Sequence, residues 1–386
     1  MHFSKRTDWE LELNEFAGAI DAAKYSGVEL LDLTLSNPTA CGFEYDAVDL
    51  LAPLSEPAAM QYAAEPLGAI PAREAVRRYY QDVNGDVALE NLCLTTSTSE
   101  AYSFLFRLLC DVGDEVLIAR PSYPLFDFIA RLDDVRLREY PLLYDPNGAG
   151  WSIDLHALEA EVSAKTRAIV VVHPNNPTGN FVSEVERAAV VRICADRGIA
   201  LIVDEVFLDY ALLGEAWRSF ATGDMPALCF VLSGISKVCG LPQMKSSWIA
   251  ACGPETQARE AMQRLEVIAD TFLSMNAPIQ QAMPQWLSNR GQIQDQIRER
   301  METNLDLLEE RLNGSSAEML AIQGGWTSVL RVPRDIDGKK FAFAALERGV
   351  VVQPGEFYGL PNGRIVLSLL TPTAVWSKGL AQLPLD

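Results

Sequence analysis

The sequence has little positive charge: 32 Lys and Arg residues stand against 52 Asp and Glu residues, which gives a formal net charge of -20. Binding to a nucleic-acid backbone or to an anionic membrane requires clustered basic residues, so neither is expected as the main partner. No apolar run reaches membrane-spanning length, and the opening stretch MHFSKRTDWELELNEF is too polar for the core of a signal peptide. These absences predict a soluble, cytoplasmic protein.

Cysteines with metal-binding or redox spacing are also missing. The seven cysteines are scattered and mostly set in apolar runs: Cys41, Cys93, Cys110, Cys194, Cys229, Cys239 and Cys252. Because no two of them have CxxC spacing, neither a structural zinc site nor a disulfide framework is expected. A reducing compartment fits this pattern best.

The composition is that of a globular protein, with 49% hydrophobic and 22% charged residues. A chain of 386 residues is longer than a single core usually grows. The length therefore predicts either two domains or one large α/β domain with an appendage.

Near-continuous apolar runs alternate with helical patterns from about residue 92 onward. The runs are NLCLTTS, EVLIARP, VRLREYP, RAIVVVHP, IALIVDE, ALCFVLSGIS and SWIAAC. Apolar strands separated by helices indicate a sheet that is covered on both faces. The pattern predicts a large, doubly wound, mainly parallel α/β domain over residues 46–275.

The two ends of the chain predict a smaller α+β domain. An amphipathic helix over about residues 6–27 is expected at the start, and a helix-rich, charged region follows the large domain over about 256–314. Its charge run is typical of a solvated helix face. The shorter strands TSVLRVP, GVVVQPG and GRIVLSLL come next, with a helical pattern FAFAALERG between the first two. Residues 276–386, completed by the N-terminal segment 1–45, are expected to form this domain.

Polar side chains follow three of the predicted parallel strands. AIVVVHP leads into Asn176, ALIV leads into Asp204, and CFVLSGIS leads into Lys237. Ligands bind beyond the carboxyl ends of strands in an open α/β sheet. An amide, a carboxylate and an amine are therefore expected on one rim of the sheet.

Each of these residues also has an ordinary structural interpretation. NNPTG contains turn-forming residues, Asp204 can be a helix N-cap, and a single lysine such as Lys237 is most often on the surface. It is the joint placement of the three that favours a ligand site.

A fourth strand, NLCLTTS, leads into a helix start at STSEAYSFLFRLL. Ser97 and Glu100 have the spacing of a capping box, which accounts for this pattern without any ligand. The same helix start, with the hydroxyls of Ser97, Thr98 and Ser99, is also suited to binding an anion. A phosphate there would suit a lysine arriving from the neighbouring strand end.

The motifs HPNNPTGN, DEVFLDY and SGISKVCGLPQMK, in this order, resemble those of the class I/II aminotransferases of the pyridoxal-phosphate fold-type I group. The similarity extends over most of the chain, through LTLSNPT, YAAEPLGAIPAREAVRRYY, TTSTSEA, GDEVLIARPSYPLFD, GVVVQPGEFYG and GRIVLSLLTP. One such motif would be weak evidence, whereas the ordered set is specific.

The resemblance implies a role for each residue at the rim. Lys237 would form a Schiff base with the aldehyde of pyridoxal 5'-phosphate and then shuttle a proton. Asp204 would keep the pyridine nitrogen protonated, so that the ring can accept electrons. Asn176 would donate to the phenolic oxygen, and Tyr123 would stack on the ring.

The resemblance also implies a phosphate site and an assembly. Ser97, Thr98 and Lys245 would bind the phosphate, together with Tyr62 from a second subunit. This implies a homodimer with shared active sites.

Three positions depart from the family pattern. Lys245 stands where the family usually has arginine, which keeps the charge and loses the bidentate fork. Phe207 stands where a tyrosine commonly donates to the phenolic oxygen, and this predicts a raised pKa for the Schiff base. Gly234 replaces a frequent hydroxyl residue. Trp326, after a pair of glycines, is expected either beside the substrate side chain or in the core.

Recognition of the substrate carboxylate is less sharply defined. Alignment through the glycine–arginine pair of GRIVLSLLT selects Arg364, whereas alignment through LS puts Val366 at the position of the family's arginine. These two residues share one face of a strand, so Arg364 is the expected ligand. Ser36, Asn37 and Asn176 are expected near the same carboxylate by resemblance.

The predicted function is amino-group exchange between an L-amino acid and a 2-oxo acid. A pyridoxal-phosphate-dependent C–S or related lyase is the alternative, because fold does not decide the reaction. A non-catalytic ligand-sensing module is a remote alternative that would require an attached DNA-binding domain. The residues do not identify the amino acid, although no second arginine can be assigned to a distal carboxylate, which favours a neutral, aliphatic or aromatic substrate.

Overall fold

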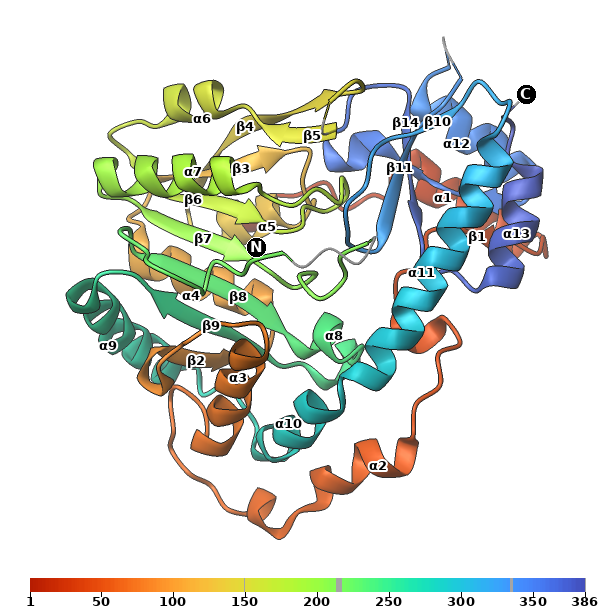
Figure 1. The fold of residues 1–386 in the computed structure, drawn as a ribbon. Helices are drawn as coiled ribbons and strands as arrows, with labels where there is room; N and C mark the ends of the chain where they lie inside the picture. The colour runs from red at the N-terminus through yellow and green to blue at the C-terminus, as the bar shows by residue number, and fades with distance from the viewer. Residues whose placement is uncertain (149, 213–216, 334–335, 386) are drawn as a thin grey trace.

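The computed structural model describes residues 1–148, 150–212, 217–333 and 336–385. They form a large α/β domain and a smaller α+β domain that lie side by side (Figure 1). Among these residues, no helix is both long and apolar enough to cross a membrane.

The large domain is built on an eight-stranded sheet with the strand order β2-β9-β8-β7-β6-β3-β4-β5. The strands are β2 (Leu92–Thr95), β3 (Glu115–Arg120), β4 (Arg136–Asp145), β5 (Gly150–Ile153), β6 (Thr166–Val172), β7 (Ala200–Asp204), β8 (Cys229–Gly234) and β9 (Ser247–Cys252). Neighbouring strands from β8 to β4 are parallel, whereas β9 and β5 run antiparallel to their neighbours. The mainly parallel sheet is confirmed, and β5 is an addition that the apolar runs did not predict.

Helices cover both faces of this sheet, because alternate strand residues point to opposite sides. One face packs against α4 (Thr98–Leu109), α5 (Phe126–Leu132) and α9 (Glu255–Phe272). The other packs against α3 (Ile70–Asp82), α6 (Leu155–Glu161), α7 (Glu184–Arg197) and α10 (Ala277–Asn289). In β7, Ile202 faces the first set and Val203 the second. The doubly wound arrangement is therefore confirmed.

The small domain combines segments from both ends of the chain. Its four-stranded antiparallel sheet has the order β10-β11-β14-β13, with β10 (Glu318–Met319), β11 (Thr327–Arg331), β13 (Gln353–Pro354) and β14 (Arg364–Ser368). The N-terminal β1 (Leu31–Asp32) pairs with β12 (Val350–Val351). Four helices enclose this core: α1 (Glu15–Tyr25), α11 (Gly291–Leu312), α12 (Gly338–Glu347) and α13 (Thr373–Gln382). The N-terminal segment thus completes the small domain, as predicted.

The pattern predicts a domain boundary at residue 276, whereas α10 packs with the large sheet. Its buried side chains Ile279, Met283 and Trp286 belong to the core between that sheet and α3. The Trp286 indole also donates to the carbonyl of Leu50, 3.0 Å away. The long helix α11, which follows α10, runs from the large domain into the small one (Figure 1).

The first helix is shorter than the pattern predicts. It begins at Glu15, because Asn14 is its N-cap and accepts from the Ala17 N–H at 2.8 Å. The residues before Asn14 form a short 3-10 turn, η1 (Lys5–Thr7), and an extended arm. The expected helix over residues 6–27 is therefore wrong in its first half.

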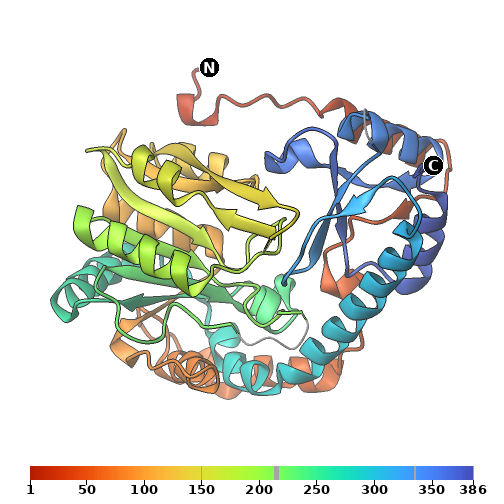
Figure 2. The ribbon, with the colours of Figure 1, turned by 45° about the horizontal axis from the view of Figure 1, so that its top comes forward.

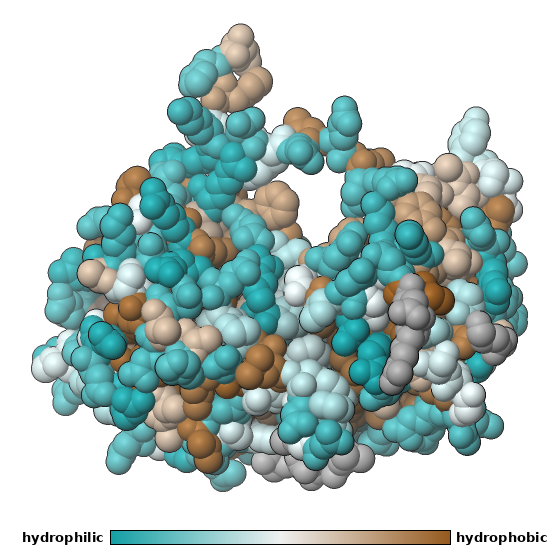
Figure 3. All heavy atoms as spheres, turned by 90° about the horizontal axis from the view of Figure 1, so that it is seen from above, coloured by the Kyte–Doolittle hydropathy of each residue, from teal (hydrophilic) through white to brown (hydrophobic). Residues whose placement is uncertain are grey.

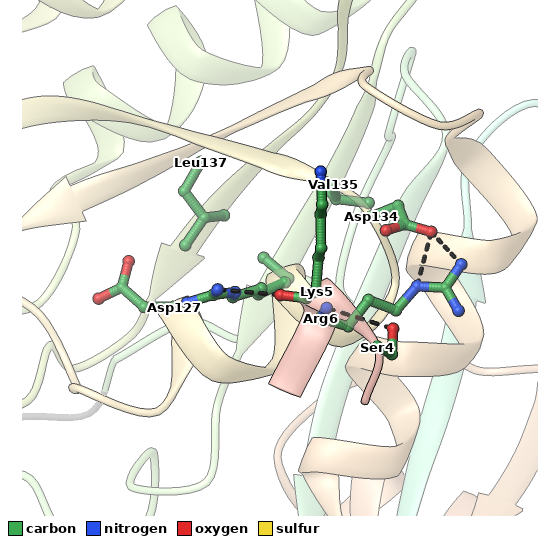
Figure 4. Close-up of a pocket in the computed structure, with 9 residues that line it drawn as sticks. Ser4, Lys5, Arg6, Asp127, Asp134, Val135 and Leu137 are labelled. Carbon is green, nitrogen blue, oxygen red and sulfur yellow. Dashed lines mark hydrogen bonds and ion pairs between the residues drawn. The ribbon is translucent and has the colours of Figure 1, made fainter. Parts of the chain in front are cut away.

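This N-terminal arm crosses from the small domain to α5 of the large domain (Figure 2). Arg6 forms an ion pair with Asp134, and the Arg131 guanidinium donates to the Lys5 carbonyl at 2.9 Å (Figure 4). The face in Figure 3 is mostly hydrophilic, and the arm bridges an opening there. Solvent-exposed ion pairs contribute little free energy, so the Arg6–Asp134 pair adds little to the attachment of the arm.

A buried histidine holds the loop between β6 and α7, on which Asn176 lies. The backbone N–H of His173 donates to the backbone carbonyl of Asp204 at 2.8 Å. The Nδ1 atom of the His173 ring accepts from the backbone N–H of Val182 at 3.0 Å. The Phe181 ring lies edge-on at 5.0 Å between ring centroids. Burial lowers the pKa of His173 to about 3, so the imidazole is neutral and can accept the Val182 hydrogen bond.

This histidine generates a prediction about the pH dependence of stability. In the unfolded chain His173 takes up a proton below about pH 6.5, whereas in the folded state it stays neutral down to about pH 3. The free energy of unfolding of the wild type should therefore fall, relative to that of His173→Phe, as the pH drops from about 6.5 to 4.5. The difference between the two proteins should change by up to about 1.4 kcal/mol per pH unit. Urea unfolding at several pH values measures it.

Comparing the wild type with His173→Phe cancels the contribution of two buried acids, which makes the protein more stable as the pH falls. Burial raises the pKa of Asp204 to about 6 and that of Glu205 to about 7, and both residues are present in both proteins. His156→Gln, on the exposed side of α6, is the control and should leave the pH dependence unchanged. Parallel pH profiles for the wild type and His173→Phe would contradict the prediction.

Candidate active site

Four neighbouring strands of the large sheet deliver polar or aromatic side chains to one rim. Tyr123 follows β3, Asn176 follows β6, Asp204 ends β7, and Lys237 lies in the short helix α8 (Ile235–Val238) directly after β8. Because β3, β6, β7 and β8 are parallel neighbours, their carboxyl ends share this rim (Figure 1).

Asp204 is a buried carboxylate held by two donors. Its Oδ1 accepts from the Val206 N–H at 3.1 Å, and its Oδ2 accepts from the Tyr102 hydroxyl at 3.1 Å. Burial raises the pKa of Asp204 to about 6, while these hydrogen bonds and the nearby charge of Lys237 act in the opposite direction. The carboxylate is therefore suited to pairing with a buried cationic N–H group.

Lys237 is partly buried at the rim of the sheet. Burial lowers the pKa of its amine, the charge of Asp204 opposes this shift, and the charge of Lys245 adds to it. The Nζ atom lies 5.7 Å from the ring centroid of Phe207 and 5.3 Å from that of Trp326. A lysine amine with a lowered pKa, beside two adjacent aromatic rings, is suited to act as a nucleophile and proton carrier.

The small domain supplies Trp326, which lies just before β11. The Gly324 N–H donates to the Gly179 carbonyl at 2.9 Å, and the Thr327 hydroxyl donates to the Pro177 carbonyl at 2.9 Å. These bonds fix the start of β11 on the loop that carries Asn176. Trp326 itself is buried, which places it in the core and beside Lys237 at once.

Asn176 keeps hydrogen-bonding capacity for a ligand. Its neighbour Asn175 is used in the loop, where its amide donates to the Thr178 hydroxyl at 2.7 Å and to the Pro121 carbonyl at 3.2 Å. The side-chain oxygen of Asn176 is buried, and it has no hydrogen-bond partner within the described part of the chain. A buried polar group of this kind is normally satisfied by a partner, and a bound ligand can be that partner.

Tyr123 lies close to the carboxylate while its ring remains accessible. The side chain is 43% exposed. Burial of the rest of the residue and the charge of Asp204 both raise the pKa of its phenol. The ring is thus at the rim, with a surface open to a ligand.

Ser97 forms one half of the expected capping box. Its Oγ accepts from the Glu100 N–H at 3.1 Å at the start of α4, which begins at Thr98. The Glu100 carboxylate accepts from the Thr96 N–H at 2.7 Å instead of closing the box on Ser97. Ser274 donates to the other Glu100 oxygen at 2.7 Å and so holds the carboxylate in this position. Ser97 and Thr98 thus stand at the N-terminal end of α4, and the anion site there stays a prediction.

Lys245 ends the 3-10 turn η6 (Pro242–Met244) and is exposed. Its backbone is left-handed, with φ of 52°. The charge of Lys245 lowers the pKa of Lys237, so the two lysines are electrostatic neighbours.

The absence of a hydroxyl residue at position 234 has a steric cause. Gly234 pairs with Ser247 across β8 and β9. A Cβ atom at Gly234 would lie 2.3 Å from the Ser247 Oγ and 2.9 Å from the Ser246 carbonyl oxygen. The close approach of these strands therefore requires glycine here.

The N-terminal candidates lie beside the last residue of β14. The Ser368 hydroxyl donates to the Leu35 carbonyl at 2.7 Å. Ser36 donates to the Thr34 carbonyl, and Asn37 accepts from the Thr39 N–H at 3.1 Å. Both side chains thus have local partners at the Ser368 end of the strand.

Arg364 lies at the opposite end of β14. Its guanidinium donates to the Asn362 and Gly363 carbonyls at 3.0 and 3.3 Å. The residue pairs with Arg331, whereas Ser368 pairs with Thr327 beside the rim. Four residues of strand separate the two pairs by about 13 Å. Within the described residues, Arg364 forms no hydrogen bond or ion pair with Lys237 or Asp204. The buried Val366 lies between Arg364 and Ser368 on the same face of the strand.

Tyr62 lies in the stretch of chain that precedes α3. It follows the 3-10 turn η4 (Pro57–Met60) and is 81% exposed.

Two tyrosines at the site were not predicted. Tyr102 donates to Asp204, and the Tyr210 hydroxyl donates to the Lys237 carbonyl at 2.7 Å. Tyr102 could have been found from helical spacing, because it lies four residues after Thr98 and so on the same face of α4. Tyr210 offered no such signal.

Comparison with known proteins agrees with this geometry. The chain matches the model of the family described as aminotransferase class I and II over residues 63–375. Glutamate-pyruvate aminotransferase AlaA of Haemophilus influenzae is 29% identical over 262 residues, which cover 67% of this chain and 63% of that protein. Alanine aminotransferase of Mycobacterium bovis is 30% identical over 277 residues, with 70% and 63% covered. The match thus spans less than two thirds of the length of these relatives.

Solved structures share the fold over nearly the whole chain. Alanine aminotransferase from Pyrococcus furiosus superposes with a TM-score of 0.88 at 21% identity, covering 99% of this chain and 98% of that one. A double mutant of Thermus thermophilus aspartate aminotransferase gives a TM-score of 0.85 at 22% identity, with the same coverage.

The packing at Gly234 generates a prediction. Gly234→Ser should lower the free energy of unfolding by roughly 1–3 kcal/mol, because the added atoms overpack the contact between β8 and β9. Adding Ser247→Gly should recover part of the loss, since it removes the nearest clashing atoms. Gly18→Ser in α1, where an added Cβ meets nothing within 4 Å, is the control without a steric cost. Urea unfolding measures all four proteins, and a Gly234→Ser protein as stable as the wild type would contradict the packing.

Proposed function

The chain belongs to the class I and II aminotransferase family, and on that premise we propose that it is a pyridoxal 5'-phosphate-dependent aminotransferase. It exchanges an amino group between an L-amino acid and a 2-oxo acid. The observation that carries this proposal is a partly buried lysine with a lowered pKa, Lys237, beside the buried carboxylate of Asp204 on the rim of the large sheet. Because the relatives are glutamate-pyruvate and alanine aminotransferases, alanine, glutamate and their 2-oxo acids are the first substrates to test.

The groups on the rim match the chemistry of this cofactor. A buried carboxylate suits the pyridine N–H, and an amine with a lowered pKa suits the aldehyde. The amide of Asn176 carries N–H groups that would donate to the phenolic oxygen. When bound, the cofactor supplies an electron-accepting ring and a reactive carbonyl carbon. The residues proposed to hold it are Lys237, Asp204, Asn176, Tyr123, Ser97, Thr98 and Lys245.

Lys237 is the proposed catalytic base and acid. Its lowered pKa brings the amine closer to the neutral form, which would take a proton from the α-carbon of the substrate and deliver it to the carbon that was the aldehyde of the cofactor. The rings of Phe207 and Trp326 line one side of Nζ and limit its contact with water. The buried carboxylate of Asp204 would hold the proton on the ring nitrogen by its negative charge.

The substrate carboxylate is proposed to lie near the Ser368 end of β14, with Ser36, Asn37 and Asn176 beside it. Arg364 is the proposed cationic ligand, because it shares a face of β14 with Ser368. To bind the substrate carboxylate, the Arg364 guanidinium has to break its hydrogen bonds to the Asn362 and Gly363 carbonyls and extend along the strand.

We further propose a cytoplasmic homodimer in which Tyr62 reaches the phosphate of the other subunit. The 81% exposure of Tyr62 in its own chain supports this role. The seven cysteines are free thiols, which supports a reducing compartment.

Half of the reaction tests the proposed function directly. L-Alanine alone, added to the protein loaded with pyridoxal 5'-phosphate, should convert the cofactor stoichiometrically to its aminated form, and pyruvate should reverse the change. Absorbance of the bound cofactor reports both steps. Lys237→Ala should slow the conversion by at least about 100-fold, because the proton carrier is lost. The exposed Lys165→Ala is the control and should react like the wild type.

Other outcomes discriminate the alternatives. Sustained release of ammonia and a 2-oxo acid without an acceptor would indicate the lyase. A covalently bound cofactor without conversion by any common amino acid would indicate the ligand-sensing module.

A second prediction concerns the phosphate. Lys245→Ala should raise the dissociation constant of pyridoxal 5'-phosphate by roughly 10- to 150-fold, which corresponds to a charge-assisted contact of about 1.5–3 kcal/mol. Lys245→Arg should bind at least as tightly as the wild type, because the charge is kept and a bidentate fork is gained. Titration of the cofactor-free protein measures the constants, and unchanged binding by Lys245→Ala would place the phosphate elsewhere.

A further inference from the structure

We propose that Tyr102 is a positioning residue for the cofactor: its hydroxyl fixes the Asp204 carboxylate in the orientation that receives the ring nitrogen. This inference rests on the proposed function and names a residue that the sequence motifs do not assign.

The hydrogen bonds of Asp204 carry the proposal. Each carboxylate oxygen accepts one donor from the protein, Oδ2 from the Tyr102 hydroxyl and Oδ1 from the Val206 N–H, both at 3.1 Å. The donors come from two different elements, α4 and the turn after β7. Two bonds on two oxygens prevent rotation of the carboxylate plane, while each oxygen keeps a further lone pair for a ligand.

Tyr102 is itself held in place by aromatic packing. Its side chain is buried, at 3% exposure. The Phe126 ring of α5 meets it edge-on, with 5.0 Å between centroids and an interplanar angle of 87°. The Phe106 ring lies 6.1 Å away on the next turn of α4. The hydroxyl is therefore presented to Asp204 from a fixed ring.

The position of Tyr102 on α4 couples two parts of the proposed cofactor site. Thr98 is the first residue of α4, and Tyr102 follows four residues later on the same face, about 6 Å along the axis. One rigid helix thus carries the proposed phosphate donors at its start and the donor to Asp204 one turn later. The spacing between phosphate and ring-nitrogen groups is fixed by a single element.

The hydrogen bond also affects the charge of Asp204. Burial raises the pKa of this carboxyl to about 6, and the bond from Tyr102 opposes that shift. Without the bond, the carboxyl takes up a proton more readily as the pH falls through the neutral range. A protonated carboxyl no longer attracts the cationic ring nitrogen, so the loss should be larger at lower pH.

The test is Tyr102→Phe, which keeps the packed ring and removes only the hydroxyl. The dissociation constant of pyridoxal 5'-phosphate for the cofactor-free protein should rise on the order of 10-fold at pH 7.5, the loss expected for a hydrogen bond to a charged group. The factor should grow as the pH is lowered toward 6. Titrations between pH 6 and 8.5 measure it, and 15N NMR of the bound cofactor should report a smaller fraction of protonated ring nitrogen than in the wild type.

The matched control is Tyr79→Phe. Tyr79 is an equally buried tyrosine whose hydroxyl donates to a partly buried aspartate, Asp209, at 3.0 Å. Both variants lose one tyrosine–aspartate hydrogen bond and should be destabilised to a similar degree. Only Tyr102→Phe should weaken the binding of the cofactor. In an Asp204→Asn background it should cause no further loss of cofactor affinity, because Tyr102 acts through Asp204.

The outcomes separate this inference from the proposed function. Wild-type cofactor affinity and ring protonation in Tyr102→Phe at every pH would overturn the role of Tyr102 and leave the aminotransferase intact. An equal loss in Tyr102→Phe and Tyr79→Phe, or a full loss in the Asp204→Asn background, would also overturn it. A wild-type protein that binds no pyridoxal 5'-phosphate would overturn both.

Discussion

The placement of a buried carboxylate, Asp204, near a partly buried lysine, Lys237, is the constraint on which the rest of the candidate site depends. Removing either charge from water is unfavourable, so desolvation raises the pKa of Asp204 and lowers the pKa of Lys237. Hydrogen bonds from Tyr102 and Val206 hold the carboxylate, and the proximity of the lysine offsets part of the cost. The adjacent parallel strands β7 and β8 set the spacing, because Asp204 pairs with Leu232 in their register.

The two domains contribute unequally to this arrangement. The large sheet provides the reactive groups, since four of its parallel strands end at the same rim. The small domain provides a wall: Trp326 lies against Lys237, and Thr327 is bonded to the loop that carries Asn176. The N-terminal arm contacts the α5 region of the large domain through Lys5 and Arg6 and through the edge-on packing of Trp9 against Phe128.

Much of the fold was predictable because apolar runs and helical periodicity are local properties of the chain. The seven runs from NLCLTTS to SWIAAC all became strands of the large sheet. The errors arose where a local rule had competition. The capping box stays half formed because Ser274 holds Glu100, the first helix starts late because Asn14 caps it, and α10 lies with the large domain because its apolar face fits against α3.

By itself, the sequence determined the fold class and indicated the candidate site residues, because polar residues that follow buried parallel strands lie at the carboxyl-end rim of the sheet. Only the tertiary structure decided which of these groups are neighbours. Tyr102 and Asp204 are 102 positions apart and meet only after the sheet has formed. Gly234 is required by Ser247 on the adjacent strand, and Arg364 is about 13 Å from the Ser368 end of its own strand. Such relations depend on strand register and on packing between distant segments, which no local pattern encodes.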